Sequence, residues 1–344
     1  MKRIIVAVVI FICFALAWHM LDLIKLKVVG QPNSTGLIST QLEQPFFAKL
    51  QIHTDLPIEV DFKTIDTLGF KDSYQLPLMK QKVFDLASLR LIQNIQHEIT
   101  LNGLDLIGLQ LNFEKARALA YAYLPVVNKH LQDKYDVKLL GLWTFGPQEL
   151  FCRKPFTKLS DLKGIRIRVV NQTMADFIAS LGAMPVIISF EETRSALHDQ
   201  MVDCAITSAT SAYSAGWLDN FNYYLPITFN TGINAYAITL SKWNQLNGKQ
   251  QVTLQKAFDH HIDTIWAYSQ QLLEETRNCI LSNQACHEKK YNIIGIQLPP
   301  EDQALINKQF FNISYKKWVD TCNQEYPQCG QEWLKLAGPI AGFQ

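Results

Sequence analysis

The sequence lacks an excess of charge of either sign. Its 344 residues carry 32 Lys and Arg against 31 Asp and Glu, so the net charge is +1. It also has no clustered stripe of Lys or Arg, which argues against nucleic acid as a partner. Low-complexity tracts and internal repeats are absent too. What remains is a globular protein that is long enough for two domains.

The common catalytic signatures are also missing. The sequence contains no G-x-G-x-x-G, P-loop, G-x-S-x-G or H-E-x-x-H motif. His260 and His261 are neighbours within a predicted long helix, so their side chains face different directions. Glu192 and Asp203 are a conceivable acid/base pair, but Glu192 is better explained as the start of a helix and Asp203 as the end of a strand. We therefore expect no enzyme activity, and the sequence calls for no cofactor.

The N-terminus has the pattern of a targeting segment. Lys2 and Arg3 precede an apolar run from Ile4 to Leu16, and Ala15-Leu16-Ala17 forms an A-x-A cleavage site. We expect residues 1–17 to be a signal peptide. The alternative is an uncleaved anchor, because the uncharged stretch extends to Leu21. Either way, the rest of the chain is predicted to be exported, to the periplasm.

Six cysteines follow the apolar segment that contains Cys13: Cys152, Cys204, Cys279, Cys286, Cys322 and Cys329. An even number in an oxidising compartment suggests disulfides. Several pairings are possible; Cys279–Cys286 and Cys322–Cys329 would close short local loops and would leave Cys152 with Cys204. A zinc site fits poorly, since there is no C-x-x-C and His287 is the only nearby imidazole. We expect no metal.

Apolar strand patterns and helical patterns alternate along the first half of the chain. Strands are predicted at residues 26–29, 58–66, 83–89 and 137–145, and helices at 41–52, 75–82 and 116–135. Such alternation is typical of α/β units with parallel sheets. The chain is expected to enter a second domain near Gly146-Pro147 and to return through a strand at 233–240. A long helix is predicted at 250–281, and the tail with Trp318 and Trp333 is expected to pack on the second lobe.

The most informative stretch runs from Leu159 to Trp217. Arg166 and Arg168 alternate with apolar residues, as on one face of a strand. An arginine near the end of a strand in an open sheet is well placed to bind a carboxylate, although a surface arginine gives the same pattern. Five further elements accompany this strand, in the order Asp161-Leu162-Lys163-Gly164, Gly182-Ala183-Met184-Pro185-Val186, Glu192, Ala196-Leu197 and Val202-Asp203.

In this order the elements resemble the DctP-like solute receptors of the tripartite ATP-independent periplasmic (TRAP) transporters, and a weaker likeness extends from about Val28 to Gly342. The resemblance implies a two-lobed periplasmic-binding-protein fold of type II-like architecture, in which each lobe is a sheet flanked by helices and a long helix spans both. Lobe I would comprise residues 28–145 plus about 235–275, and lobe II residues 146–234 plus about 276–344. The resemblance would also place Cys152 and Cys204 beside the same part of a sheet.

The resemblance also implies a function. The protein would bind a small organic acid in a cleft between the lobes and deliver it to the small and large membrane subunits of a TRAP transporter. Two other roles stay open: a sensor that presents the ligand to a signalling partner, and an exported enzyme that uses the same cleft.

The candidate ligand-binding residues follow from this comparison. Arg168 matches the arginine that grips the ligand carboxylate with two hydrogen bonds. Phe190 matches a pocket-lining position, although plain core packing explains it equally well. The family's ligand-binding asparagine is replaced here, so Thr207 or Ser208 would supply a hydroxyl instead. Further candidates are Trp217 as a wall of the pocket, Arg153 as a second cation, and Ser88, Arg90 and Gln31 from the first lobe.

Overall fold

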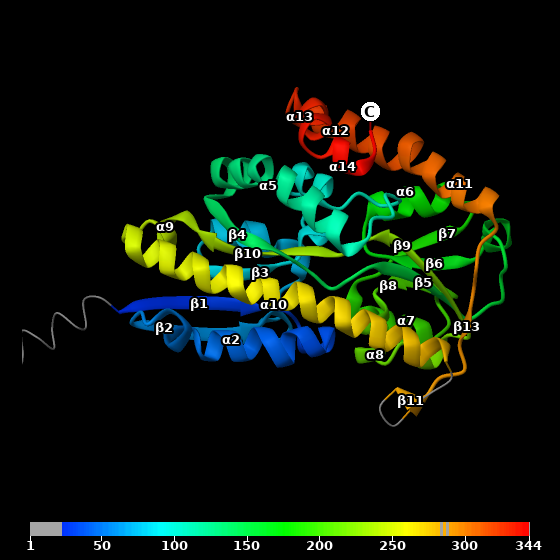
Figure 1. Cartoon of the computed structure of the whole chain (residues 1–344), viewed down its shortest axis with the longest axis horizontal. Helices are drawn as coiled ribbons and strands as arrows, with labels where there is room; N and C mark the ends of the chain where they lie inside the picture. Colours follow the sequence, from blue (N-terminus) through cyan, green and yellow to red (C-terminus); the bar gives the residue numbers. More distant parts are fainter. Residues whose placement is uncertain (1–22, 283–284, 287–288, 344) are drawn as a thin grey trace, which may run out of the picture.

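The computed structural model describes residues 23–343 apart from 283–284 and 287–288. Within this part the chain forms two large sheets, each flanked by helices (Figure 1). The predicted signal peptide and Cys13 lie outside the described residues. No helix among the described residues is both long and apolar enough to cross a membrane.

The first sheet has the strand order β2-β1-β3-β10-β4. Its strands are β1 (Ile24–Gly30), β2 (Ile58–Thr64), β3 (Leu86–Leu89), β4 (Val137–Thr144) and β10 (Ile233–Thr239). Strands β1, β2 and β3 are parallel, whereas β10 runs antiparallel between β3 and β4. Strand β10 therefore returns from the second lobe into the middle of the first, as the sequence predicted.

The second sheet has the order β13-β9-β5-β8-β6-β7. Its strands are β5 (Gln148–Cys152), β6 (Arg166–Val169), β7 (Met184–Ile187), β8 (Cys204–Thr207), β9 (Tyr223–Asn230) and β13 (Ile294–Gly295). Strand β6 pairs in parallel with β7 and β8. The carboxyl ends of these three strands therefore meet at one edge, where ligands of open α/β sheets bind.

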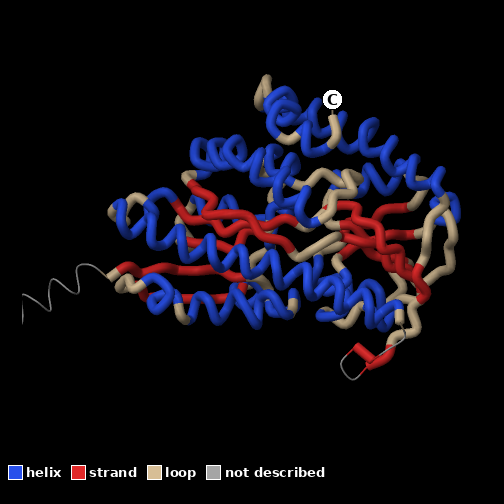
Figure 2. The backbone as a smooth tube through the Cα atoms, in the orientation of Figure 1, coloured by secondary structure: helices blue, strands red, loops and turns tan. Residues whose placement is uncertain are grey.

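Helices cover both faces of the sheets (Figure 2). They are α2 (Gln44–Ala48), α3 (Leu50–Thr54), α4 (Gln75–Lys80), α5 (Phe113–Tyr135), α6 (Gln172–Ser180), α7 (Phe190–His198), α8 (Ala209–Ser214), α9 (Leu240–Trp243), α10 (Gly248–Leu281), α11 (Pro300–Gln309), α12 (Lys316–Glu325), α13 (Cys329–Leu336) and α14 (Gly338–Ala341). Short helical turns include η2 (Ile38–Glu43), η5 (Leu91–Gln93), η6 (Ile99–Leu104) and η9 (Phe310–Tyr315). A small hairpin, β11 (Ala285–Cys286) and β12 (Lys289–Lys290), follows α10.

Helix α10 spans both lobes (Figure 1). Its N-terminus is fixed by a capping box in which Asn247 and Gln250 bond each other's backbone N–H. In the first lobe the indole of Trp266 donates to the carbonyl of Leu142 at 2.8 Å. In the second lobe Arg277 forms an ion pair with the buried Glu149. The helix is therefore anchored to both sheets and ties the lobes together along one side.

A carboxylate holds one of the strand crossings between the lobes. Asp105 accepts hydrogen bonds from the side chain of Asn230 at 2.8 Å and from the backbone N–H groups of Thr231, Gly232 and Ile233. These residues link β9 to β10. Gly232 has φ 69°, and a Cβ there would approach the amide of Gln148 to 2.6 Å, so the turn requires glycine.

The tail corrects one expectation. Residues 310–343 pack mainly on the first lobe, because Trp318 and Trp333 join its hydrophobic core. The Trp318 indole donates to Ile99 O at 3.0 Å and the Trp333 indole to Gly103 O at 2.7 Å. Both carbonyls belong to η6, beside α5. The tail also contacts the second lobe through the ion pair of Lys317 with Asp176 on α6, and the preceding α11 adds Ile306 to the core of that lobe.

Two predicted disulfides are confirmed. Cys152–Cys204 joins the paired strands β5 and β8, and Cys322–Cys329 joins α12 to α13. Cys279 is disulfide-bonded as well. The side chain of its predicted partner, Cys286, lies outside the described residues, as does His287.

Candidate functional site

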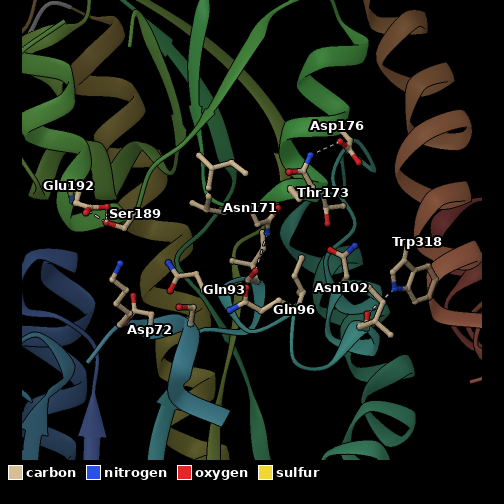
Figure 3. Close-up of a pocket in the computed structure, with 18 of the residues that line it drawn as sticks. Asp72, Gln93, Gln96, Asn102, Asn171, Thr173, Asp176, Ser189, Glu192 and Trp318 are labelled. Atoms are coloured by element: carbon tan, nitrogen blue, oxygen red, sulfur yellow. Dashed lines mark hydrogen bonds between the residues drawn. The ribbon is translucent and has the colours of Figure 1, made fainter. Parts of the chain in front are cut away.

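A large groove of about 1050 Å³ lies between the lobes. The first lobe lines it with Asp72, Gln93, Gln96 and Asn102, the second with Asn171, Thr173, Asp176, Ser189 and Glu192, and the tail with Trp318 (Figure 3). Isoleucines and a valine supply much of the remaining surface: Ile65, Ile92, Ile95, Ile99, Val170, Ile187 and Ile313. Both lobes and the tail therefore contribute side chains to the lining of the groove.

A smaller cavity of about 40 Å³ adjoins this groove and shares Ile92, Gln93 and Val170 with it. Its lining combines cations, amides, hydroxyls and apolar groups: Arg90, Phe145, Gln148, Arg168, Met174, Phe190, Thr207, Ser211, Asn230, Gly232, Ile233 and Asn234. We call it the inner cavity. Convergent polar groups in a mostly apolar hollow are typical of a ligand site.

Arg168 supplies a buried positive charge to the inner cavity. It lies on β6, its side chain is 1% exposed, and its guanidinium sits 5.3 Å from the centre of the Trp217 ring. Nε donates to the carbonyl of Ile188 and Nη1 to that of Ile206, both at 3.0 Å. Nη2 is buried without a hydrogen-bond partner among the described residues.

Burial and, to a smaller extent, the nearby Arg90 lower the pKa of Arg168 to about 9, while Glu191 opposes the shift. The guanidinium therefore remains charged near neutral pH. A buried cation whose bonds go only to neutral carbonyls is costly, and an anion in the cavity would relieve that cost.

Arg90 is the second cation of the inner cavity, and it is already paired. It follows β3 and its Nη1 donates to Asp72 within the first lobe. The same nitrogen lies 3.4 Å from Glu191 Oε1 on α7 of the second lobe. Both carboxylates pair with Arg90, so Arg168 is the cation of the inner cavity that has no ion-pair partner among the described residues.

The structure brings four of the predicted residues together at the inner cavity: Arg168, Arg90, Phe190 and Thr207. Trp217 lies behind them, with its ring 4.7 Å from that of Phe190 and beneath Arg168. Ser208 caps α8, where its Oγ accepts from the N–H of Ser211 at 3.1 Å. These last two residues support the lining and do not form it.

Three predicted residues lie elsewhere. Arg153 donates to the carbonyls of Leu197 and Asn220 and lines neither the groove nor the inner cavity. Gln31 and Ser88 bond each other inside the first lobe, with Gln31 Nε2 2.9 Å from Ser88 O and 3.1 Å from Ser88 Oγ. Both are fully buried, because the side chains after β1 and in β3 turn into a polar network of the core instead of the cleft.

The two carboxylates considered as an acid/base pair have structural partners instead. Ser189 caps α7 and bonds Glu192 at 2.6 Å. Asp203 pairs with Arg166 and with Lys154. Burial tends to raise the pKa of Asp203, but hydrogen bonds from these two cations outweigh it and bring the pKa to about 2.

Sequence reasoning missed the amides Gln148, Asn230 and Asn234. They lie at the start of β5, the end of β9 and the start of β10, which are the points where the chain crosses between lobes. The predicted crossings at 146–147 and 233–240 were the available signal, since residues at such crossings meet at a cleft.

Comparison with known proteins finds a matching family model and related sequences. The family model DctP, described as bacterial extracellular solute-binding protein, family 7, matches residues 114–312. A Haemophilus influenzae protein described as uncharacterized is 23% identical over 197 residues, which cover 56% of this chain and 58% of that protein. The match thus spans little more than half of its length.

Solved structures share the fold over nearly the whole chain. A Bordetella pertussis extracytoplasmic solute receptor that binds pyroglutamic acid has a TM-score of 0.77 and 19% identity, covering 91% of this chain and 99% of its own. A TRAP periplasmic solute-binding protein from Desulfovibrio desulfuricans, with bound sn-glycerol-3-phosphate, has a TM-score of 0.77 and 19% identity, with 92% and 97% covered. Both support a two-lobed α/β fold.

Proposed function

The chain belongs to family 7 of the bacterial extracellular solute-binding proteins, and on that premise we propose that it captures a small carboxylate between its lobes for a TRAP-type transporter. The ligand carboxylate binds Arg168 in the inner cavity, and the rest of the molecule extends into the groove. The loaded receptor then docks on the small and large membrane subunits of the transporter.

The unpaired Nη2 of Arg168 carries this proposal. It is the buried cationic donor of the inner cavity that lacks a partner among the described residues. A guanidinium binds a carboxylate through short charge-assisted hydrogen bonds. Because the positive charge is already in place and held by two carbonyls, the site needs no rearrangement of this residue to receive an anion.

Charge and size favour a carboxylate over a phosphate. Related structures hold pyroglutamic acid in one case and sn-glycerol-3-phosphate in another, so both anions suit the fold. Here Asp72 and Glu191 pair with Arg90, which leaves Arg168 as the cation of the inner cavity without an ion-pair partner among the described residues. A single carboxylate matches that charge, whereas a phosphate dianion would exceed it in a cavity of about 40 Å³.

Disulfides in the chain and the family's extracellular location both support action outside the cytoplasm. We propose that residues 1–17 direct export. Ligand contacts made with both lobes favour the closed state, and closure is a hinge motion about the strand crossings and α10.

Calorimetric titration of the purified protein, after unfolding and refolding to remove any bound ligand, tests the proposal. The titrants are organic monocarboxylates, dicarboxylates and phosphate esters. We expect one carboxylate class to bind, and Arg168→Ala to weaken its binding by about 100-fold or more. Arg153→Ala is the matched control, because this arginine also donates to backbone carbonyls but lies outside both cavities. Unchanged affinity in Arg168→Ala, or binding of phosphate esters alone, would refute the proposal.

A further inference from the structure

Asn230, at the end of β9, lines the inner cavity and carries a side-chain amide of fixed orientation. Its side chain is 2% exposed, and Nδ2 donates to Asp105 Oδ2 at 2.8 Å. A carboxylate such as Asp105 only accepts, so this bond fixes which end of the amide is the nitrogen. The other end, Oδ1, is buried without a hydrogen-bond partner among the described residues.

The inner cavity therefore contains an unpaired donor and an unpaired acceptor: Arg168 Nη2 and Asn230 Oδ1. The donor calls for an anion. The acceptor calls for an O–H or N–H group, because buried acceptors that stay unpaired cost binding free energy. Both atoms belong to residues that line a space of about 40 Å³, which holds only a few non-hydrogen atoms. The two ligand groups that satisfy them are thus separated by a few bonds.

We infer that Asn230 is a specificity-determining residue that selects carboxylates carrying an O–H or N–H group on the carbon next to the carboxylate. The inference rests on the proposed function and narrows its ligand class to 2-hydroxy acids and acids with a nitrogen-bound hydrogen at the same position. Gln93 Oε1, a second buried acceptor without a partner in the described part of the chain, lines both the inner cavity and the groove. It faces the path along which the rest of the ligand extends.

Two matched ligand pairs test the inference: lactate against propionate, and pyroglutamate against 3-oxocyclopentanecarboxylate. In each pair the second acid keeps the carboxylate and the carbon skeleton or ring size but lacks the hydrogen-bond donor. For the pair that fits the groove, calorimetry should give about 10- to 100-fold tighter binding of the donor-bearing acid. In Asn230→Ala that preference should nearly vanish, because only the donor-bearing acid loses affinity.

Asn222→Ala is the control, since this exposed amide donates to the carbonyl of Arg153 and lies outside both cavities. It should leave both affinities unchanged. Equal binding of both acids by the wild type would overturn the inference. So would an equal loss for both acids in Asn230→Ala, which would make Asn230 a hinge residue only. These outcomes leave the proposed function intact, whereas binding by none of the carboxylates would overturn both.

Discussion

Arg90 of the first lobe and Glu191 of the second meet across the cleft, with Nη1 and Oε1 3.4 Å apart. Arg90 follows β3, and Glu191 lies in the first turn of α7. A second contact lies close by, where Asn171 Nδ2 donates to the carbonyl of Ile92 at 3.0 Å. The lobes are thus joined by polar contacts beside the inner cavity, on side chains that separate when the cleft opens.

The first prediction concerns this ion pair. In Glu191→Gln the ligand-free protein should open, with the ratio of open to closed molecules rising about two- to fivefold, because a partly exposed ion pair contributes less than about 1 kcal/mol. Single-molecule energy transfer between dyes on the two lobes measures the ratio. Asp199→Asn is the control, since the exposed carboxylate of Asp199 bonds His198 within the second lobe. An unchanged ratio of open to closed molecules in Glu191→Gln would show that this ion pair does not hold the lobes together.

The second prediction concerns Glu43, which is buried in the first lobe. Its Oε2 accepts from the Gln31 N–H at 2.8 Å, and Oε1 lies 3.3 Å from the Tyr236 hydroxyl. That hydroxyl lies 3.1 Å from Nε2 of His261, whose pKa burial lowers to about 3. Burial raises the pKa of Glu43 to about 7, against the opposing hydrogen bonds.

Because the folded protein keeps this proton up to a higher pH than the unfolded chain does, the contribution of Glu43 to stability should fall as the pH rises from about 4.5 to 7. His261 contributes with the opposite sign up to about pH 6.5, because its buried imidazole binds a proton less readily than in the unfolded chain. The loss from Glu43 amounts to at most about 3 kcal/mol. Glu43→Gln should remove this part of the pH dependence, as measured by urea unfolding at several pH values. The exposed Glu59→Gln, which breaks a surface pair with Lys25, should keep it. If the free energy of unfolding depends on pH in the same way in Glu43→Gln as in the wild type, Glu43 is ionised throughout this pH range.

The third prediction separates the two disulfides by the loops that they close. Cys152–Cys204 spans 52 residues and Cys322–Cys329 spans 7. The chain-entropy relation gives a stabilisation of about 4 kcal/mol for the longer loop and about 2.5 kcal/mol for the shorter. Replacing each pair by alanines should therefore destabilise the protein more at residues 152 and 204, as measured by urea unfolding. In addition, thiol titration of the denatured, unreduced wild type should detect no free thiol from these four cysteines.

The fourth prediction follows from the packing of the tail. Trp333→Ala should cost about 3–5 kcal/mol because the indole fills the core of the first lobe. Amide hydrogen exchange should accelerate in η6 and α5, which the tail covers, and remain slow in β6 and β8 of the second lobe. Leu336→Ala, at a partly exposed neighbouring position, is the control. Faster exchange in the second lobe instead would place the tail there.

Most of the strands and helices could be predicted because their apolar periodicity is local. The strand at 137–145 and the long helix at 250–281 match β4 and α10 closely. The tail could not be placed by the same reasoning. Trp318 and Trp333 indicate that α12 and α13 each bury an apolar face against the rest of the protein. The sequence contains no signal for which lobe offers the complementary surface.

Local sequence likewise predicted only part of the candidate site. Arg168 could be predicted because the motif around it is contiguous, and its place on β6 follows from alternation. Gln31 and Ser88 were assigned to the cleft because they accompany strands β1 and β3, yet their side chains turn into the core. Whether a polar side chain near a strand end faces a cleft or a buried partner depends on residues distant in sequence, such as Glu43 and Gln75.

The sequence by itself determined the family, the alternation of strands and helices, and the place on a strand of Arg168, the arginine that we propose binds the ligand, since each depends on residues close together in the chain. The tertiary structure alone decided that Arg90 pairs with Asp72 and Glu191 while Arg168 keeps a donor without a partner among the described residues. It also decided that Asp105 bonds the amide nitrogen of Asn230, so that the amide oxygen has no partner among the described residues. Charge balance and hydrogen-bond satisfaction are sums over spatial neighbours, and those neighbours exist only once the chain has folded.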